Sequence, residues 1–471
     1  MKPLTMSLFM NDSRHASAGP ISLPAVSGTL YSLYSNKRVG AWAGACIQGA
    51  TTATAGGGST MDIGFDSNNN LSAAALTSNS AIAVNKSYDQ SGNGRDLTNN
   101  GTNPRPYVTA SQTAYPVIPI QFGGIDNVSP PEQNLQTVNT LSIDRRNMTM
   151  YMVLNPRVSI ATSSWFEYRT AGARQLTGVV YNGQNGFYTA DQGLGLNVTG
   201  QRPRAQPIFL AITSSASGMS IYINEQKFDF AAYSAVTIDQ LVLGLSGIGG
   251  GWGFKGDMFF HATYTGVHSQ SEVLSMRAAL APAFNVPLSF TSRVVFVGDS
   301  ITQGIGTMRN LIDQLGLAGA ELFNLGIAGE TAAGAYTSRA SREGGLYTAA
   351  YGAKNCVCVY GHGINDIIND LVVDGAALYT IVDGHEAYGA GLGYKTVIRQ
   401  LTVADFLTAP RQTKRGDYNT LVAANSMGAT ATALLGSTLI NSDCIDGLHP
   451  KQSGYALMAP VVKSAIQTAM A

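Results

Sequence analysis

The first pattern along this chain is a series of short apolar runs from about residue 21 to residue 265. The runs are rich in β-branched and aromatic residues, and Gly, Asn, Ser and Pro separate them; the clearest lie at 148–154, 207–213, 219–224 and 257–264. The run at 219–224 and residues 228–230 flank a polar Glu-Gln-Lys segment, which predicts a hairpin. Many short strands with almost no long helical period predict an all-β sandwich that ends with 257–264.

From residue 291 onward the pattern changes to alternating strands and helices. Candidate strands lie at 293–297, 321–325, 355–360 and 396–403, with helical or loop segments between them. Such alternation predicts an α/β domain in which helices cover both faces of a parallel sheet. Ligands bind such sheets at the carboxyl ends of the strands, so residues with chemical roles are expected just after each strand.

The segment between the two patterns predicts a helix followed by a linker. Residues 269–281 have a helical pattern with a capping box of Ser269 and Glu272, and Pro282 opens a linker that runs to Thr291. The chain, at 471 residues, is too long for one ordinary core, and its first residues are polar and aperiodic. We therefore expect a flexible arm (1–20), a β-sandwich (21–268), a helix and linker (269–291) and an α/β domain (292–471).

Composition narrows the range of partners and locations. Charged residues make up only 12% of the chain, against about 25% in average soluble domains, and the formal net charge is zero. Since Lys and Arg form no cluster, nucleic acid and anionic membranes are not expected as partners. The sequence has no apolar run of the ~18 residues that a membrane span needs, and the apolar part of residues 1–10 is too short for a signal peptide. An extracellular or virion-associated location, reached by assembly, lysis or a route other than Sec, is favoured over the cytoplasm.

The first candidate chemical motif is Gly298-Asp299-Ser300, which directly follows the first strand of the α/β pattern. Residues from Gln303 to about Leu317 then predict a helix. A strand, a tight turn and a helix with serine at the turn is the arrangement by which α/β hydrolases present a nucleophile, and the helix N-terminus favours negative charge there. Position 302 is Thr, so the Gly-x-Ser-x-Gly elbow of many hydrolases is not satisfied.

Three further motifs accompany this serine along the chain. The second strand leads to a segment with Gly329, the third leads to Asn365, and a C-terminal segment reads Asp446-Gly-Leu-His449. A serine hydroxyl is a weak nucleophile that needs a base, and His449 is the candidate. Side chains three residues apart on a helical turn are neighbours, so Asp446 can hold the imidazole in one tautomer and stabilise its charged form.

These four motifs together resemble those of the GDSL/SGNH hydrolase family, whose blocks carry Ser, Gly, Asn and His in this order. The resemblance covers residues 292–471, with Ile301 where the family name has Leu. It implies a flavodoxin-like α/β fold with no cofactor or metal, a catalytic Ser300, Asp446 and His449, and an oxyanion hole. That hole would consist of the main-chain N–H groups of Ser300 and Gly329 and the side-chain amide of Asn365.

The N-terminal half also resembles a family. Tyr31-Ser-Leu33, residues 62–66 and above all the Tyr-Asp-Gln-Ser-Gly-Asn-Gly segment at 88–94 are similar to the arabinofuranosidase-B-type, concanavalin-like β-sandwich. Such domains also occur on phage tail and bacterial surface proteins. A glycosidase needs two carboxylates at a defined separation, but Glu167 is the single candidate, so the sequence provides no such pair. The resemblance therefore implies a carbohydrate-binding or accessory domain.

Several other polar residues have competing interpretations. Asp89, Ser91 and Asn93 suit the start of a calcium loop, but position twelve would be Asn100, and an Asx-rich turn that bonds its own backbone is the alternative. Trp42, Trp165 and Trp252 could stack on sugars or pack in the core. The four cysteines show no disulfide framework and suit small buried hydrophobic positions.

Within the α/β half, further polar residues have alternatives. Asp299 could react or brace its loop, and Asp443 is a rival of Asp446. His362 could touch substrate or have a structural role, and Tyr455 suits helix packing. Asp383, His385 and Glu386 resemble a metal site in composition, but on a glycine-rich loop they fall short of a convincing ligand set.

The sequence favours a serine esterase that removes O-acetyl groups from a polysaccharide. The motifs indicate ester hydrolysis, whereas the polysaccharide follows from the sandwich by analogy. One alternative is a phage tail or surface glycan-binding protein with an inactive SGNH scaffold, and another is a lipase or thioesterase for longer acyl chains. The expected partner is an O-acetylated polysaccharide or another ester, and a homo-oligomer or attachment to a virion is compatible with the sequence.

Overall fold

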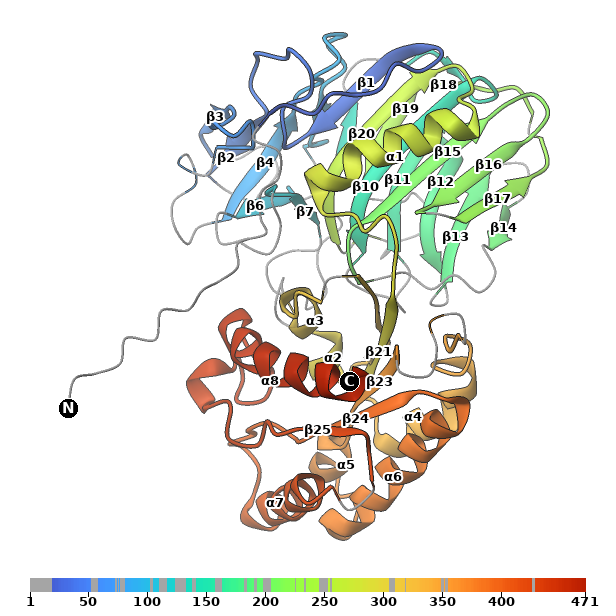
Figure 1. Ribbon diagram of the computed structural model, residues 1–471. Coiled ribbons are helices and arrows are strands. Elements are labelled where there is room, and N and C mark those ends of the chain that lie inside the picture. Colours follow the sequence, from blue (N-terminus) through green and yellow to red (C-terminus); the bar gives the residue numbers. More distant parts are fainter. Residues whose placement is uncertain are drawn as a thin grey trace.

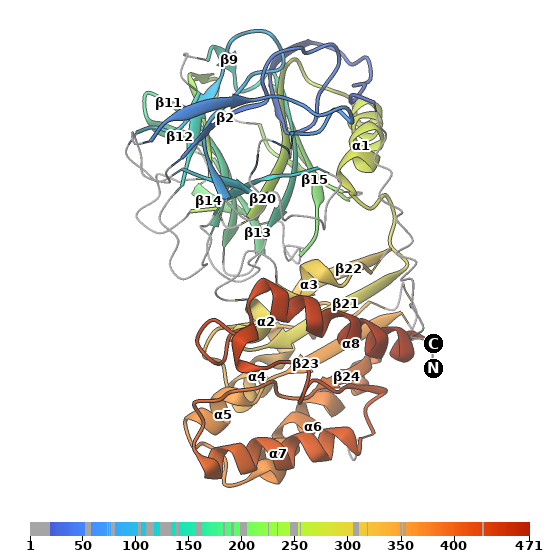
Figure 2. The ribbon, with the colours of Figure 1, turned by 90° about the vertical axis from the view of Figure 1, so that its left-hand side faces the viewer.

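The chain folds into two domains, a β-rich N-terminal domain and an α/β C-terminal domain (Figures 1 and 2). The structure is a computed structural model. It describes residues 19–51, 58–72, 74, 76, 81–101, 105–109, 117–122, 133–137, 141–156, 163–181, 184–189, 193–197, 205–224, 226–232, 234–244, 253–254, 256–304, 310–317, 319–348, 351, 355–425 and 428–471.

The N-terminal domain is a large antiparallel assembly in which strands distant in sequence pair. One row of strands runs β1 (Thr29–Ser35), β20 (Gly256–Thr265), β10 (Met148–Pro156), β15 (Ile208–Ser214), β16 (Met219–Ile223) and β17 (Gln226–Phe230). Another runs β8 (Leu135–Thr137), β19 (Gln240–Leu243), β11 (Ser163–Thr170), β12 (Ala173–Tyr181), β13 (Gln184–Thr189) and β14 (Gly193–Asn197). The predicted hairpin is confirmed as β16–β17.

Shorter strands complete this domain. They are β2 (Ile47–Ala50), β3 (Thr60–Ile63), β4 (Ala81–Ser87), β5 (Leu97–Thr98), β6 (Tyr107–Thr109), β7 (Ile120–Phe122), β9 (Ile143–Asp144) and β18 (Thr237–Ile238). Strand β20 is the last of the domain, as the sequence predicts.

The apolar run of β10 is explained by burial on both faces. Met150 and Met152 face the core between the two rows of strands, whereas Tyr151 and Val153 belong to a separate cluster with helix α1 (Gln270–Phe284). Successive side chains of a strand point to opposite faces, so a strand covered on both sides is apolar throughout. Burial of one such side chain contributes about 1.5–3 kcal/mol.

Helix α1 extends further than the sequence pattern predicts. It begins at the predicted capping box of Ser269 and Glu272, but it continues through Pro282 to Phe284 and ends at Asn285, whose φ is 55°. The last turn is held by burial of Phe284, whose ring lies 6.1 Å from Phe259 between centroids. Packing therefore outweighs the hydrogen bond that proline removes, and the prediction that Pro282 opens the linker is wrong.

The C-terminal domain is a parallel sheet with helices on both faces. Its strand order is β22 (Ala320–Asn324), β21 (Ser292–Gly298), β23 (Cys356–Gly361), β24 (Lys395–Arg399) and β25 (Ala431–Ala433). Figure 2 shows α3 (Leu311–Gln314) and α8 (Gln452–Met470) on one side, and α4 (Ala332–Ser338), α5 (Ile364–Ile368), α6 (Gly375–Leu392) and α7 (Ala409–Ala423) on the other. All four cysteines lie within the described residues, and each is buried and free, as expected.

Two local predictions in this domain are wrong. The helix expected from Gln303 to Leu317 does not form as one element, because α2 (Ser300–Gln303) ends at Gly304, whose φ is 84°, and α3 begins at Leu311 with its own cap at Asn310. Residues 305–309 of the expected helix lie outside the described residues. A left-handed glycine terminates a helix whatever the hydrophobic period beyond it. Strand β24 ends at Arg399 rather than at residue 403, and the short β25 has no counterpart among the predicted strands.

The two domains are joined by contacts as well as by the connecting chain. The main-chain N–H of Ala205 donates to the carbonyl oxygen of Leu322 in β22 (2.8 Å), and the Leu322 N–H donates to the Gln206 side chain (2.8 Å). Ala205 is buried in the core of the α/β domain. A segment of the N-terminal half thus lies along β22, which is an edge strand of the parallel sheet. Among the described helices, none has the length and apolar character needed to cross a membrane.

Candidate active site

Ser300 lies at the carboxyl end of β21, on a turn with little free space. A Cβ at Gly298 would lie 1.9 Å from the Thr302 hydroxyl oxygen, so only glycine fits before the turn. Asp299 caps α2 by accepting a hydrogen bond from the Ile301 N–H (3.0 Å), and Ser300 is the first residue of that helix. Because α2 spans only four residues, negative charge at Ser300 would be stabilised by individual main-chain N–H groups rather than by the dipole of a long helix.

Ser300, His449 and Asp446 form one chain of hydrogen bonds. The Ser300 Oγ lies 2.9 Å from His449 Nε2, and His449 Nδ1 lies 2.7 Å from Asp446 Oδ2. A carboxylate only accepts hydrogen bonds, so the neutral imidazole carries its proton on Nδ1 and offers Nε2 as an acceptor to the serine hydroxyl. The three side chains are therefore arranged so that the histidine can take the serine proton.

The reason for the proximity of Asp446 and His449 differs from the sequence prediction. They lie on a turn with Gly447 at a φ of 81° rather than on a helix, and Asp446 Oδ1 accepts the N–H groups of Leu448 (3.0 Å) and His449 (2.8 Å). Burial acts to raise the pKa of Asp446, but these bonds and the imidazole outweigh it and hold the pKa below its usual value. The rival Asp443 instead accepts the Ile440 N–H (3.0 Å).

The loop after β22 is fastened to the end of β21. The Leu325 N–H donates to the Phe296 carbonyl (2.8 Å), and the Ile327 N–H donates to the Gly298 carbonyl (2.9 Å). A Cβ at Gly326 would lie 2.3 Å from the Gln303 nitrogen, so this loop passes very close to α2. Gly329 has a φ of 75° and is exposed, a conformation that glycine adopts without strain.

Asn365 joins the same edge of the sheet from α5, just after β23. Its side-chain amide donates to the Glu330 main-chain oxygen (2.9 Å), which links this motif to the loop that contains Gly329. An amide nitrogen carries two hydrogens, so the second can serve another acceptor. The motifs with Ser300, Gly329 and Asn365 thus follow three neighbouring strands, β21, β22 and β23. Their catalytic roles stay predictions.

Sequence reasoning missed three charged residues beside this edge. Arg399, at the end of β24, donates from Nη2 to the Thr302 hydroxyl (3.0 Å) and to the Gly361 carbonyl (3.2 Å). Glu330 and Arg342 form an ion pair with His362 next to them. The sequence signals that could have identified Arg399 and Glu330 are an arginine at the end of a predicted strand and a glutamate directly after Gly329. His362 is buried and bonded to Glu330, which favours the structural interpretation of that residue.

The residues with metal-like composition lie on α6 rather than on the expected loop. His385 is buried against Glu343, with 2.5 Å between Nε2 and Oε1, and Glu386 accepts a hydrogen bond from Thr396. Within the part of the chain that the structure describes, His, Cys, Asp and Glu form no group of three that could hold a metal ion. Tyr455 is buried in α8, where its hydroxyl donates to the Ile301 carbonyl (2.7 Å).

In the N-terminal domain, the polar candidates bond to their own surroundings. Asp89 accepts the N–H groups of Leu33 (2.9 Å), Ser91 (3.0 Å) and Arg95 (3.0 Å), which is the Asx-type alternative to a calcium loop. Glu167 is buried and paired with Arg169. Trp165 is buried, Trp42 is half-buried, and Trp252 lies outside the described residues.

Burial makes Asp299 titrate unusually. Its carboxyl is 1% exposed, and its Oδ2 has no hydrogen-bonding partner among the described residues. This burial raises its pKa to about 6, although the charge of Arg399 and the bond from Ile301 act in the opposite direction. These features favour the interpretation that Asp299 braces the turn.

Asp299→Asn is therefore expected to stabilise the protein in a pH-dependent way. The wild-type carboxyl binds its proton more tightly when folded, so wild-type stability falls as pH rises from about 4 to about 6 and then levels off. Asn still caps α2 but does not titrate, so the stability of the variant lacks this dependence on pH. At pH 7 the free energy of unfolding of Asp299→Asn should exceed that of the wild-type protein by on the order of 3 kcal/mol. Thermal unfolding from pH 4 to pH 8 measures this difference; parallel curves for the two proteins would contradict it.

Among the comparisons with known proteins, solved structures match this chain, and each of the following matches covers only part of it. No family model and no curated protein matches the sequence. Similar solved structures include a lipolytic protein of the G-D-S-L family from Veillonella parvula, at 19% identity and a TM-score of 0.32, with 37% of this chain and 97% of that chain covered. A mutant acetylxylan esterase from Geobacillus stearothermophilus matches at 15% identity and a TM-score of 0.32, covering 38% and 95%.

An arabinofuranosidase in complex with arabinofuranosyl-α-1,2-xylobiose also matches, at 15% identity and a TM-score of 0.41. This match covers 55% of the present chain and 65% of the arabinofuranosidase chain, which is less than two thirds of its length.

Proposed function

We propose that this protein is a serine esterase of the SGNH type. The observation that supports the proposal is the unbroken hydrogen-bond chain from Ser300 Oγ through His449 to Asp446, with distances of 2.9 and 2.7 Å. This order of groups is what a serine needs in order to attack a carbonyl carbon, since the base lies within reach and is itself oriented.

The reaction proceeds in two halves. Ser300 Oγ attacks the ester carbonyl carbon as His449 Nε2 takes the hydroxyl proton, which forms a tetrahedral intermediate. The intermediate collapses, His449 returns that proton to the leaving alcohol oxygen, and an acyl-serine remains. Water then attacks the acyl-serine with His449 again as base, which releases the carboxylic acid and restores Ser300. Asp446 stabilises the imidazolium in both halves.

The negative oxygen of each intermediate needs preorganised donors. The main-chain N–H groups of Ser300 and Gly329 and the side-chain amide of Asn365 take this role in the proposal. All three follow neighbouring strands at one edge of the sheet, and the contact from Asn365 to the Glu330 carbonyl joins two of them. Donors held before the reaction starts need no reorganisation as the charge develops.

We further propose that the ester is an O-acetyl group on a polysaccharide. Asp446 is half exposed, with a side-chain exposure of 52%, so a polymer can approach the triad from this side. Next to it lies a surface depression of about 730 Å³ with both polar and apolar lining, which includes Phe406, Ser442 and Lys451. An exposed aromatic ring beside hydrogen-bonding groups suits a sugar. The N-terminal sandwich, concanavalin-like in this proposal, would bind or position the glycan.

Acetate release from a panel of O-acetylated polysaccharides tests the proposal, with Ser300→Ala as the control. We expect acetate from at least one polysaccharide with the wild-type protein and none above background with the variant. A series of p-nitrophenyl esters of increasing chain length separates a deacetylase from a lipase or thioesterase. A preference for long acyl chains would overturn the acetyl assignment, and glycan binding without any hydrolysis would indicate an inactive scaffold.

Phe406→Ala tests the polysaccharide contact separately. Phe406 is 51% exposed in the depression beside Asp446, and loss of its ring should raise the KM for the polysaccharide by about 3- to 10-fold. The KM for p-nitrophenyl acetate should change much less, because that ester carries no sugar to contact the ring. Leu457→Ala, which removes a side chain of similar exposure (47%) from α8, is the matched control. An unchanged KM for the polysaccharide would exclude this contact.

A further inference from the structure

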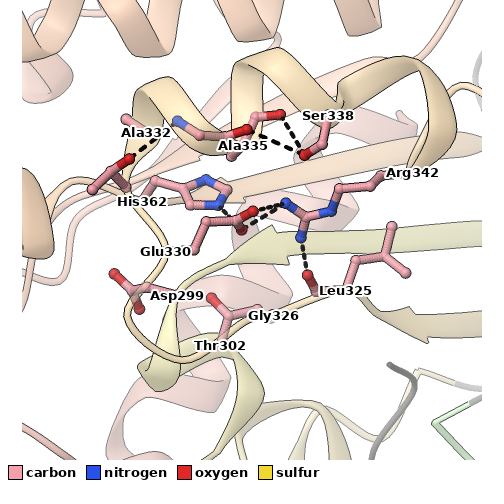
Figure 3. A network of polar contacts seen from close by, with 12 residues as sticks. Asp299, Thr302, Leu325, Gly326, Glu330, Ala332, Ala335, Ser338, Arg342 and His362 are labelled. Carbon is pink, nitrogen blue, oxygen red and sulfur yellow. Dashed lines mark hydrogen bonds and ion pairs between the residues drawn. The ribbon is translucent and has the colours of Figure 1, made fainter. Parts of the chain in front are cut away.

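One arginine fastens both ends of the loop that contains Gly329. Arg342 follows a 3-10 turn (Arg339–Ser341) and reaches back across the end of the sheet. Its Nη1 lies 2.7 and 2.6 Å from the two carboxylate oxygens of Glu330, and its Nη2 donates to the main-chain oxygen of Leu325. Figure 3 shows the guanidinium between these two partners. The loop from Leu325 to Glu330 is thus closed by a single side chain.

His362 holds the same carboxylate from the other side. Its Nε2 lies 3.1 Å from a Glu330 oxygen, and the ring is 1% exposed (Figure 3). Burial lowers the pKa of His362 to about 4, although the carboxylate acts to raise it, so the ring is neutral at pH 7 and donates from Nε2. Burial acts to raise the pKa of Glu330, but the bond from His362 and the charge of Arg342 outweigh it, so Glu330 is ionised.

The main chain of Glu330 connects this ion pair to the proposed oxyanion hole. Its N–H donates to the Ile327 carbonyl (3.1 Å), and its carbonyl accepts the side-chain amide of Asn365 (2.9 Å). Its nitrogen is also bonded to the carbonyl carbon of Gly329, the residue whose own N–H is the proposed donor. Two of the three proposed donors therefore take their position from one residue, whose side chain is held by Arg342 and His362.

A direct contact between the Glu330 carboxylate and the substrate does not explain why this residue is charged. A carboxylate close to a developing oxyanion disfavours it, unless a cation neutralises that carboxylate. Burying an ion pair also costs desolvation, so stability alone is a weak reason for it. Arg342 Nη1 contacts both carboxylate oxygens, so the guanidinium neutralises the carboxylate and fixes its direction at the same time, which a neutral side chain would not do.

We propose that Glu330, Arg342 and His362 form a clamp that positions the oxyanion hole of this enzyme. The clamp residues are positioning residues that do not touch substrate, and they act through Gly329 and Asn365. This inference rests on the esterase function proposed above. Loss of the clamp should leave substrate binding nearly unchanged and slow the chemical step, since the donors are needed most when the charge develops.

The same fold contains a matched ion pair for comparison. Arg293 Nε lies 2.8 Å from Glu321 Oε2, and Arg293 Nη1 donates to the Leu346 main-chain oxygen (2.6 Å). As in the clamp, an arginine bridges a glutamate and a carbonyl group, and here the glutamate is fully buried. The pair lies near the beginning of β21 and β22, however, at the end of the sheet opposite to Ser300. Loss of either pair should affect stability, whereas only the clamp should affect catalysis.

The test compares Glu330→Gln with Glu321→Gln in the full chain, by kcat and KM for p-nitrophenyl acetate and by thermal unfolding. We expect Glu330→Gln to lower kcat by about 10- to 100-fold with KM within about 3-fold, which is less than removal of a whole donor. Glu321→Gln should lower the unfolding temperature and keep kcat within about 2-fold. Equal kcat values for Glu330→Gln and Glu321→Gln would overturn the clamp.

Arg342→Lys provides a second measurement if Glu330→Gln does not fold. Lysine keeps the charge but is a point donor that does not bridge the carboxylate and the Leu325 carbonyl, so kcat should fall with KM nearly unchanged. Wild-type kcat in Arg342→Lys would overturn the clamp while the esterase proposal stands. Absence of Ser300-dependent hydrolysis in the wild-type protein would overturn both.

Discussion

Ser300→Ala is expected to lower ester hydrolysis by about 10⁴- to 10⁶-fold, to the background rate of the ester in buffer. The substitution removes the atom that forms the acyl intermediate in the proposed mechanism, and neither His449 nor Asp446 would replace it. Ser300 is 4% exposed and Ala adopts the same position in α2, so the fold should be retained. Release of p-nitrophenol from p-nitrophenyl acetate, beside thermal unfolding, measures both properties.

A second readout and a control make the Ser300 result specific. A fluorophosphonate should add to the wild-type protein at Ser300 and leave Ser300→Ala unmodified, as seen by intact-mass spectrometry. Ser453→Ala, which removes an exposed hydroxyl from the first turn of α8, should keep the wild-type rate. Retention of more than about a tenth of the activity in Ser300→Ala would show that the nucleophile lies elsewhere.

Asn365→Ala is expected to lower kcat by about 100- to 1,000-fold, the usual effect of losing one oxyanion donor. In the proposed role, the amide of Asn365 would stabilise the charge that develops in the transition state more than the neutral ester, so KM should change little. The substitution also removes the bond to the Glu330 carbonyl (2.9 Å), which loosens the loop of Gly329. Steady-state kinetics with p-nitrophenyl acetate separates kcat from KM.

Asn369→Ala is the matched control for this change. Asn369 lies at the end of the same short helix and donates to the Asn365 main-chain oxygen (2.9 Å), but its side chain is exposed. Its replacement should cost a little stability and leave kcat unchanged. If Asn365→Ala and Asn369→Ala lowered kcat equally, the effect would arise from α5 as a whole rather than from an oxyanion donor.

Three motifs of the candidate site, those with Ser300, Gly329 and Asn365, are predictable from the sequence because each follows a strand. Parallel strands place their carboxyl ends at one edge of a sheet, so strand patterns alone predict that Ser300, Gly329 and Asn365 lie together. The regular apolar runs locate β21, β22 and β23 within one or two residues. The length of the helix after Ser300 is not predictable in this way, because the left-handed conformation of Gly304 is a property of one backbone angle that a hydrophobic period does not reveal.

Contacts between distant residues lie beyond the reach of sequence patterns. Arg342 bonds to Glu330 across twelve positions and Arg399 to Thr302 across ninety-seven, and neither pairing follows a helical or strand period. The approach of Asp446 to His449 is predicted for a wrong reason, since a turn around Gly447 brings them together instead of a helix. In the N-terminal domain, β1 pairs with β20, more than two hundred residues later, so no local pattern predicts that order.

The contact of Ala205 and Gln206 with Leu322 bears on how the protein can be divided. A boundary near residue 291 divides the two sequence patterns, but hydrogen bonds between Leu322 of the parallel sheet and residues 205 and 206 cross that boundary. A fragment that begins at β21 would present the outer edge of β22 to solvent, and an open edge of this kind pairs readily with other chains. In the full chain, Ala205 and Gln206 of the N-terminal half bond to this edge, so at Leu322 it is not open for pairing.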